Sequence, residues 1–156
     1  LNKVVQNTKS TRKSKSYNKG NTKKYWISNE KSIGEERIET FLNQNRIFHL
    51  MYARFNDCIN PLTGQNLIFD FYLPLQNTII EYDGSQHDEY TPKFHGSKKS
   101  GKFEKQQAKD IVKDEYCKNK KFNLIRIKYA QWNEIEDILT KEVLNKLNKL
   151  SKNIKN

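Results

Sequence analysis

Cysteine, proline and long apolar runs are scarce in this sequence of 156 residues, which has two cysteines and three prolines. Cys58 and Cys117 are too few for a disulfide framework and favour a reducing compartment. No apolar stretch approaches the roughly 20 residues of a membrane span, and no signal-peptide pattern opens the chain. We therefore expect an intracellular protein, in the cytoplasm of a host cell, that is neither secreted nor bound to a membrane.

Acidic residues are in the minority: 29 Lys and Arg residues face 18 Asp and Glu residues, for a net charge of +11. Nine of the basic residues, but only one acidic residue, lie in residues 1–31. This segment has almost no apolar periodicity, which predicts a flexible basic arm over residues 1–31, with Lys23 and Lys24 as DNA contacts. Such an arm binds polyanions in a salt-dependent way, and a solubilising tail is the alternative.

The remaining residues, 32–156, have the patterning of one ordered α/β domain. Ser32 and Glu35 form a capping-box pattern that predicts a helix ending near Asn45, and Asn133 with Glu136 form a second one at the start of the last helix. Between them, apolar patterning predicts strands over residues 47–55, 67–73, 78–83 and 122–127, and a helix over residues 103–119. The order α, β, β, β, α, β, α predicts a mixed sheet covered by helices.

Three acidic residues stand within or at the end of apolar strands: Asp70 in LIFDFYL, and Glu81 and Asp83 in TIIEYD. A buried carboxylate costs several kcal/mol unless it is paired or binds a metal ion. If Asp70 and Glu81 end adjacent strands on one side, they form a hard-oxygen site suited to Mg²⁺, for which Mn²⁺ would substitute. Glu81 and Asp83 alternate to the same face of an extended strand, so Asp83 is a third candidate ligand.

Residues suited to phosphodiester chemistry follow directly. His87 comes four residues after Asp83, and beside a bound metal ion it could act as general base or acid near neutral pH. The sequence predicts a long polar loop over residues 84–101, and loops of this length are often functional. The candidate contacts to a DNA backbone are the basic residues in and just after this loop: Lys93, Lys98, Lys99, Lys102 and Lys105.

Several segments together match a known pattern. They are SIGEERIETFL from Ser32, Asp57-Cys58, LIFDFYLP from Leu67, IEYDGSQH from Ile80, FEKQQAKD from Phe103, DEYC from Asp114 and LIRI from Leu124. In these residues and in element order, the chain resembles the restriction-endonuclease-like αβββαβ core of the PD-(D/E)XK nuclease superfamily. It is more closely similar to the very-short-patch-repair-like branch, which includes phage homing endonucleases with an E, D, H, D constellation. The resemblance runs from about Ser32 to Tyr129 and fits an intracellular protein encoded by a virus or phage.

The resemblance implies a nuclease domain over residues 32–156, with a C-terminal helix after its core. The implied activity is a metal-dependent DNA endonuclease that uses Mg²⁺ and hydrolyses phosphodiester bonds, as a nick or a double-strand break. By position, Asp70 matches the metal-binding acid of the second core strand, and Glu81 matches the (D/E) of the motif. Asp83 stands where the superfamily has its lysine, so the chain departs from the plain motif. His87 is implied in proton transfer.

Two further acids are catalytic candidates through the same resemblance: Glu35 in the first helix and Asp110 in the helix after the loop. Each has a structural alternative. Glu35 is explained by its capping box, and Glu36 is a rival for its catalytic role. Asp110 could instead pair with Arg126.

Other functions stay open at the level of sequence. A DNA-binding module that kept the fold but lost turnover is the main alternative to the nuclease, and in either case the protein could act as a homodimer on DNA. A structural protein with a charged arm is a third. A zinc site is disfavoured because its candidate ligands lack CxxC or HxxxH spacing. Those candidates are Cys58, His87, His95 and Cys117.

Overall fold

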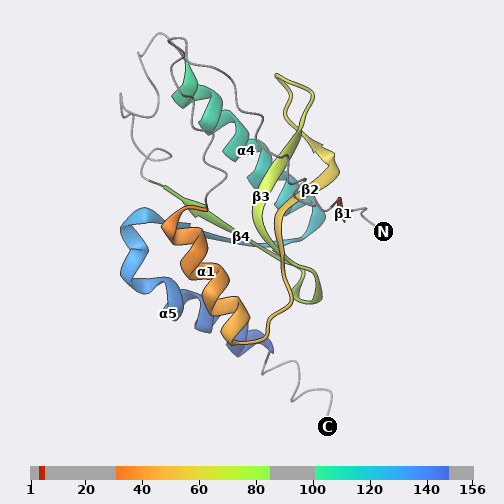
Figure 1. Cartoon of the computed structure of the whole chain (residues 1–156). Helices are drawn as coiled ribbons and strands as arrows, with labels where there is room; N and C mark the ends of the chain where they lie inside the picture. Colours follow the sequence, from red (N-terminus) through yellow and green to blue (C-terminus); the bar gives the residue numbers. More distant parts are fainter. Residues whose placement is uncertain (1–3, 6–30, 85–100, 148–156) are drawn as a thin grey trace, which may run out of the picture.

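The computed structural model describes residues 4–5, 31–84 and 101–147, and these form a mixed sheet with helices packed against it (Figure 1). The strands lie in the spatial order β1-β2-β3-β4-β5. Neighbouring strands are antiparallel from β1 to β4, whereas β5 runs parallel to β4. The strand bounds are β1 Val4–Val5, β2 Leu50–Ile59, β3 Asn66–Leu73, β4 Thr78–Asp83 and β5 Asn123–Lys128.

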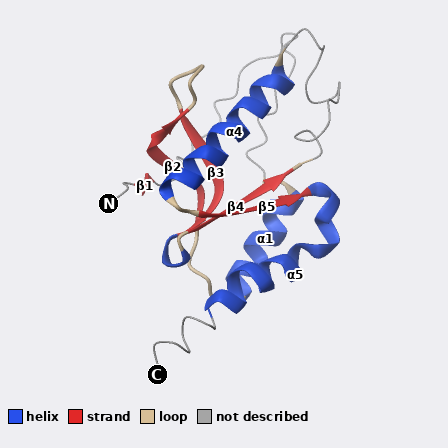
Figure 2. Ribbon diagram, turned by 180° about the vertical axis from the view of Figure 1, so that it is seen from behind, coloured by secondary structure: helices blue, strands red, loops and turns tan. Residues whose placement is uncertain are grey.

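The helices form a layer on each face of the sheet (Figure 2). Helix α4 lies on one face, whereas α1 and α5 lie together on the other. The helix bounds are α1 Ile33–Gln44, η1 Pro74–Gln76, α4 Lys102–Lys120, η3 Tyr129–Glu134, α5 Ile135–Leu139 and η4 Thr140–Leu144. The expected mixed α/β architecture is therefore confirmed. None of the helices in the described ranges is long and apolar enough to cross a membrane.

One apolar cluster on each face of the sheet holds the layers together. Because successive side chains of a strand point to opposite faces, Ile80 of β4 joins the cluster under α1 and α5, while Ile79 joins the cluster under α4. The α4-side cluster contains both cysteines as free thiols. Burial raises the pKa of Cys58 to about 11 and that of Cys117 to about 12, so both thiols remain protonated core residues at neutral pH.

The first long strand does not follow the expected range of residues 47–55. β2 begins at Leu50 and extends to Ile59. The backbone amide of Ile47 donates to the carbonyl of Leu42 at 2.9 Å, and its side chain is buried with those of α1. Ile47 is therefore part of the turn that ends α1, which is why the apolar pattern misplaced the strand.

The expected capping box of Asn133 and Glu136 is also wrong. Residues Tyr129–Glu134 form a 3₁₀ segment, and α5 begins at Ile135 without a side-chain cap. The Glu136 carboxylate instead accepts two hydrogen bonds of 2.6 Å from the guanidinium of Arg37 in α1. A tertiary ion pair thus replaces the local cap.

Strand β1 lies within the segment that the sequence predicted to be an arm, and it was not expected. It pairs with β2, with Val4 opposite Phe55 and Val5 opposite Arg54. The rest of the predicted arm, residues 1–3 and 6–30, lies outside the described residues, as do residues 148–156.

The start of α1 packs closely on β4. The predicted capping box is confirmed: the Ser32 hydroxyl accepts from the Glu35 amide at 3.2 Å, and the Glu35 carboxylate accepts from the Ser32 amide at 3.3 Å. Between them, Gly34 is buried against the ring of Tyr82, and a Cβ at Gly34 would lie 2.2 Å from a ring carbon. The glycine therefore lets α1 approach β4 closely enough to bring Glu35 near the strand end.

We predict that Gly34→Ala lowers the free energy of unfolding by about 1–3 kcal/mol, because the added methyl group overlaps the Tyr82 ring. At an uncrowded helix position the same change stabilises by roughly 0.5–1 kcal/mol, so the expected sign is the opposite of the intrinsic one. Urea unfolding followed by circular dichroism measures the difference. In a Tyr82→Ala background the cost should largely disappear, and an equal cost in both backgrounds would show that crowding by Tyr82 is not its cause.

Candidate active site

The strands β3 and β4 separate at Asp70 and Glu81. Their antiparallel ladder pairs Leu73 with Thr78, Tyr72 with Ile79 and Phe71 with Ile80, and it stops there. Beyond it, the Asp70 amide donates to the Glu81 carboxylate at 3.3 Å, and the Tyr82 amide donates to the Asp70 carboxylate at 2.8 Å. Side-chain carboxylates thus take over from backbone carbonyls, and the two acids come together where the strands part.

Lys113 of α4 supplies a positive charge to this pair. Its ammonium group lies 2.6 Å from Glu81 Oε2, and the side chains of Lys113 and Glu81 are only 10% and 3% exposed. Burial raises the pKa of both carboxyls, and the proximity of Glu81 raises that of Asp70 further, whereas Lys113 opposes the rise at both. Two ionised carboxylates carry two negative charges, and the one buried ammonium group beside them neutralises only one. The remaining negative charge favours the binding of a cation.

Glu35 reaches the same region from the start of α1. Its carboxylate accepts a hydrogen bond of 3.0 Å from the hydroxyl of Tyr52 in β2. Tyr52 has a φ of 51°, a left-handed conformation that bulky residues rarely adopt. Since Met51 pairs with Phe71 and Ala53 with Phe69, Tyr52 lies on β2 next to Asp70. Backbone strain of this kind tends to occur at functional sites, where the surrounding structure maintains it.

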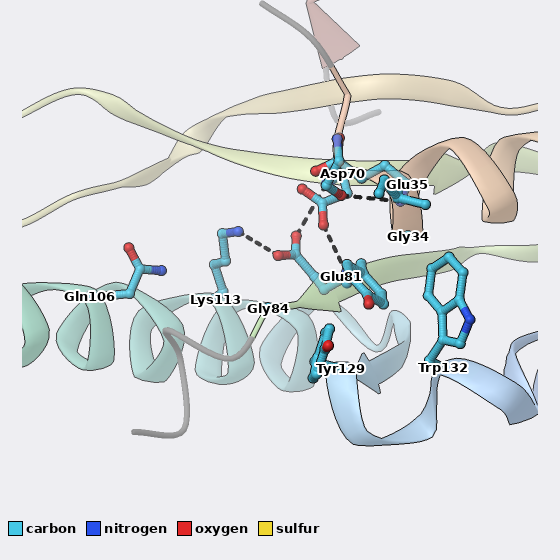
Figure 3. Close-up of a pocket in the computed structure, with 12 residues that line it drawn as sticks. Gly34, Glu35, Asp70, Glu81, Gly84, Gln106, Lys113, Tyr129 and Trp132 are labelled. Carbon is cyan, nitrogen blue, oxygen red and sulfur yellow. Dashed lines mark hydrogen bonds and ion pairs between the residues drawn. The ribbon is translucent and has the colours of Figure 1, made fainter. Parts of the chain in front are cut away.

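These groups open into a pocket of about 610 Å³. Figure 3 shows Asp70, Glu81 and Glu35 grouped together, with Lys113 and Gln106 of α4 on one side and Tyr129 and Trp132 on the other. The pocket is lined by Ser32, Ile33, Gly34, Glu35, Asp70, Glu81, Tyr82, Gly84, Gln106, Lys113, Tyr129 and Trp132. It therefore combines an acidic centre, a buried ammonium and an aromatic wall.

Asp83 is placed differently from the other two strand acids. Its carboxylate accepts from Arg126 Nη1 at 2.8 and 3.1 Å, and Arg126 also lies 2.7 Å from Asp114. Asp83 does not line the pocket that Asp70 and Glu81 share. The structure thus brings together two of the three expected metal ligands and gives the third an ion-pair partner on β5.

Asp110 lies on α4 one turn before Lys113. Its carboxylate accepts a hydrogen bond of 3.3 Å from Gln106, a pocket residue. The alternative was an ion pair between the Asp110 carboxylate and Arg126. Arg126 Nη2 instead donates to the backbone oxygen of Asp110, at 3.5 Å. Asp110 therefore stands beside the pocket, in contact with a residue that lines it.

Several of the predicted site residues lie outside the described residues: His87, Lys93, Lys98, Lys99, Lys23 and Lys24. Lys102 and Lys105 are exposed in the first turns of α4. Within residues 4–5, 31–84 and 101–147, no group of three or more His, Cys, Asp or Glu side chains has the arrangement of a metal site. Cys58 and Cys117, two members of the disfavoured zinc set, are buried in the core on the α4 face.

Sequence reasoning missed Lys113, although a signal was present. Ile111 of α4, although apolar, is 59% exposed. The residues that α4 buries are Lys113, Tyr116 and Cys117, at helical spacing along one face. A lysine on the buried face of a helix needs a counter-charge, and Glu81 in an apolar strand needs the same. Tyr129 and Trp132 gave no comparable signal, because only the fold brings them to the pocket. The same holds for Tyr52, whose contact with Glu35 joins residues of two different elements.

No family model matches the chain, and no solved structure matches it. The chain is 37% identical over 90 residues to uncharacterized protein 094L of Frog virus 3, with 56% of each protein covered. It is 34% identical over 86 residues to uncharacterized protein 307L of Invertebrate iridescent virus 6 (52% of this chain, 41% of that protein). It is also 34% identical over 99 residues to uncharacterized protein 033L of Invertebrate iridescent virus 3 (64% and 50%). The chain thus spans about half the length of these curated viral relatives.

We predict that Asp70→Asn stabilises the protein when divalent cations are chelated, because it removes one of two crowded negative charges. Since the pKa of Asp70 is raised on folding, the native state holds more protons than the unfolded state as the pH rises from about 4. The free energy of unfolding of the wild type therefore falls as the pH rises from about 4 toward the raised pKa of about 8. The free energy of unfolding of Asp70→Asn should fall less over the same pH range. Thermal unfolding in EDTA at several pH values measures this, and a 1 kcal/mol difference shifts Tm by roughly 2–8 °C.

The same measurement separates cation binding from a general charge effect. Mg²⁺ or Mn²⁺ should raise the Tm of the wild type but not that of Asp70→Asn. Glu115→Gln, which removes an exposed carboxylate of α4, is the matched control and should respond to cations like the wild type. Equal cation responses in all three proteins would count against a site at Asp70.

Proposed function

We propose that this chain is a metal-dependent DNA endonuclease that hydrolyses phosphodiester bonds. One observation carries the proposal: Asp70 and Glu81 converge in a pocket at the point where β3 and β4 part, and Lys113 pairs with Glu81 there. Carboxylates and an ammonium group in one partly enclosed site suit both a hard cation and a phosphate group. The sequence resemblance to the PD-(D/E)XK nucleases points to the same chemistry.

The donor groups of the pocket fit Mg²⁺ as the cofactor. Mg²⁺ is commonly held by one or two carboxylates, with waters and substrate phosphate oxygens as its other ligands. Asp70 and Glu81 would hold it, and Glu35 lines the same pocket. When bound, it would polarise the scissile phosphate and lower the pKa of a coordinated water. The carboxyls of Asp70 and Glu81 have raised pKa values, so a bound cation would stabilise their ionised forms.

The residues around the acids have separate tasks in this proposal. Lys113 would share the Glu81 carboxylate with a bound cation, and its ammonium group would then be available to a phosphate oxygen in the same pocket. The Tyr52 hydroxyl and the Ser32 amide fix the Glu35 carboxylate, which can orient the attacking water. His87 follows β4 by four residues, and proton transfer to the leaving oxygen is the role we assign to it.

The start of α4 would carry the DNA backbone toward the pocket. Lys102 and Lys105 are exposed there, and Gln106, one residue further along the helix, already lines the pocket. Such contacts bind phosphates irrespective of sequence and weaken with salt. Lys23, Lys24, Lys93, Lys98 and Lys99, which lie outside the described residues, are the other DNA contacts that we propose.

We predict that the full chain nicks or cuts plasmid DNA with Mg²⁺ or Mn²⁺ but not in EDTA. Asp70→Asn and Glu81→Gln should each reduce cleavage by at least about 100-fold, because each removes a charged ligand. Their DNA affinity should be equal or higher, since less negative charge faces the phosphates. Gel assays of cleavage and fluorescence anisotropy of binding test the two effects separately.

The outcomes of that experiment distinguish the alternatives. Cleavage that persists in EDTA, or in Asp70→Asn, would refute the metal mechanism. Salt-sensitive binding without any cleavage would identify a DNA-binding module that lacks turnover. If the chain neither bound nor cleaved DNA, the result would favour a structural protein with a charged arm.

Lys113 gives a second prediction for the same activity. Lys113→Met keeps most of the side-chain volume but removes the charge, so we expect kcat to fall by about 10²–10³-fold. Cation binding should persist, because Glu81 loses a competitor for its carboxylate. Lys118→Met, at an exposed position of the same helix, is the control and should cleave normally. A near-normal kcat in Lys113→Met would show that Lys113 is only a structural partner of Glu81 and does not act in catalysis.

A further inference from the structure

The pocket has an aromatic wall that the catalytic groups do not use. Tyr129 is 60% exposed, and Ile33, also 73% exposed, lines the same pocket. Tyr82 and Trp132, which are half-buried, also line this pocket. Figure 3 shows Trp132 on the far side of the acids from Lys113, and Tyr129 below Glu81. A volume of about 610 Å³ is in the range of pockets that enclose a small organic ligand, which is more than an ion and a phosphate oxygen require.

We propose that this wall binds an unpaired nucleobase, so that the preferred substrate is single-stranded or locally unpaired DNA. The inference rests on the proposed function and specifies its substrate class. Aromatic side chains stack on any base, because every base has a π-face. A nucleotide whose phosphate lies at the acids and Lys113 can place its base against Tyr129. A base inside an intact duplex is paired and stacked on both sides, so it cannot enter a pocket unless it is unpaired first.

Two residues of the wall, Trp132 and Tyr82, are held in place by contacts with α1. The guanidinium of Arg37 lies 4.7 Å from the centre of the Trp132 ring and donates to the Trp132 carbonyl at 2.7 Å. The same guanidinium is fixed by Glu136. On β4, the Tyr82 ring lies against Gly34, where no side chain intervenes. These contacts fix Trp132 and Tyr82 before a ligand binds, which reduces the entropy lost on binding.

Charge complementarity favours a nucleotide over a purely apolar ligand. The pocket offers the Lys113 ammonium and the Gln106 amide at one side and aromatic carbon at the other. A nucleotide has the same division, with an anionic phosphate joined to a flat aromatic base. An apolar peptide or lipid would leave Glu81, Asp70 and Lys113 desolvated without a partner, which is costly.

The test uses the full chain in EDTA with oligonucleotides that contain 2-aminopurine, whose fluorescence falls when it stacks on an aromatic ring. We expect tighter binding and stronger quenching for a single strand, or for a duplex with one unpaired 2-aminopurine, than for the fully paired duplex. Tyr129→Ala should weaken single-strand binding by about tenfold, the effect of losing one base–aromatic contact. Tyr129→Phe keeps the ring and should bind within about twofold of the wild type.

Phe48→Ala is the matched control, because Phe48 is 57% exposed but lies outside this pocket; it should bind like the wild type. Equal binding of paired and unpaired DNA, or unchanged single-strand binding and quenching in Tyr129→Ala, would overturn the inference. Cleavage with Mg²⁺ that is indifferent to Tyr129 and to pairing would overturn it while leaving the nuclease proposal intact. Binding that depends on Tyr129 without cleavage would support base stacking and reject the nuclease.

Discussion

The contact between Glu81 and Lys113 is the interaction around which the site is organised. It links β4 to α4 with almost no exposure to solvent, and it offsets part of the cost of placing Asp70 and Glu81 side by side. A buried ion pair of this kind contributes little net stability, because desolvation cancels most of the attraction. Its value lies in position: it keeps two carboxylates and one ammonium group at the end of the shared ladder of β3 and β4.

The surrounding fold accepts local costs to keep that arrangement. Tyr52 has a left-handed backbone conformation inside β2. At position 34 a glycine, which has no side chain, lets α1 approach Tyr82. Both features bring Glu35 toward the acids, through the Tyr52 hydroxyl and the close start of the helix. The two apolar clusters under α1 with α5 and under α4 supply the packing that offsets such costs. The apolar side chains on the two faces of the sheet thus stabilise the fold, whereas the ends of β3 and β4 position the site.

Prediction from sequence succeeded where the signal was local or periodic. The capping box of Ser32 and Glu35 and the alternation of helices and strands needed only nearby residues. It also pointed to Asp70 and Glu81, because acids in apolar strands require a partner, and the structure places these two residues in contact. It failed at Glu136, where a distant arginine replaced the expected cap, and it did not anticipate that Asp83 pairs with Arg126. In both cases the competing partner is remote in sequence.

Composition and local patterning were enough to establish the mixed α/β class, the excess of positive charge and the presence of carboxylates that cannot be buried alone. The pairing of charges followed only from the folded arrangement, which joins Lys113 to Glu81, Arg126 to Asp83 and Arg37 to Glu136. That arrangement alone also brought Tyr129 and Trp132 into the pocket of the acids. The physical reason is that helix and strand periodicity depends on neighbours along the chain, whereas Coulomb attraction and pocket shape depend on distances in space that packing sets.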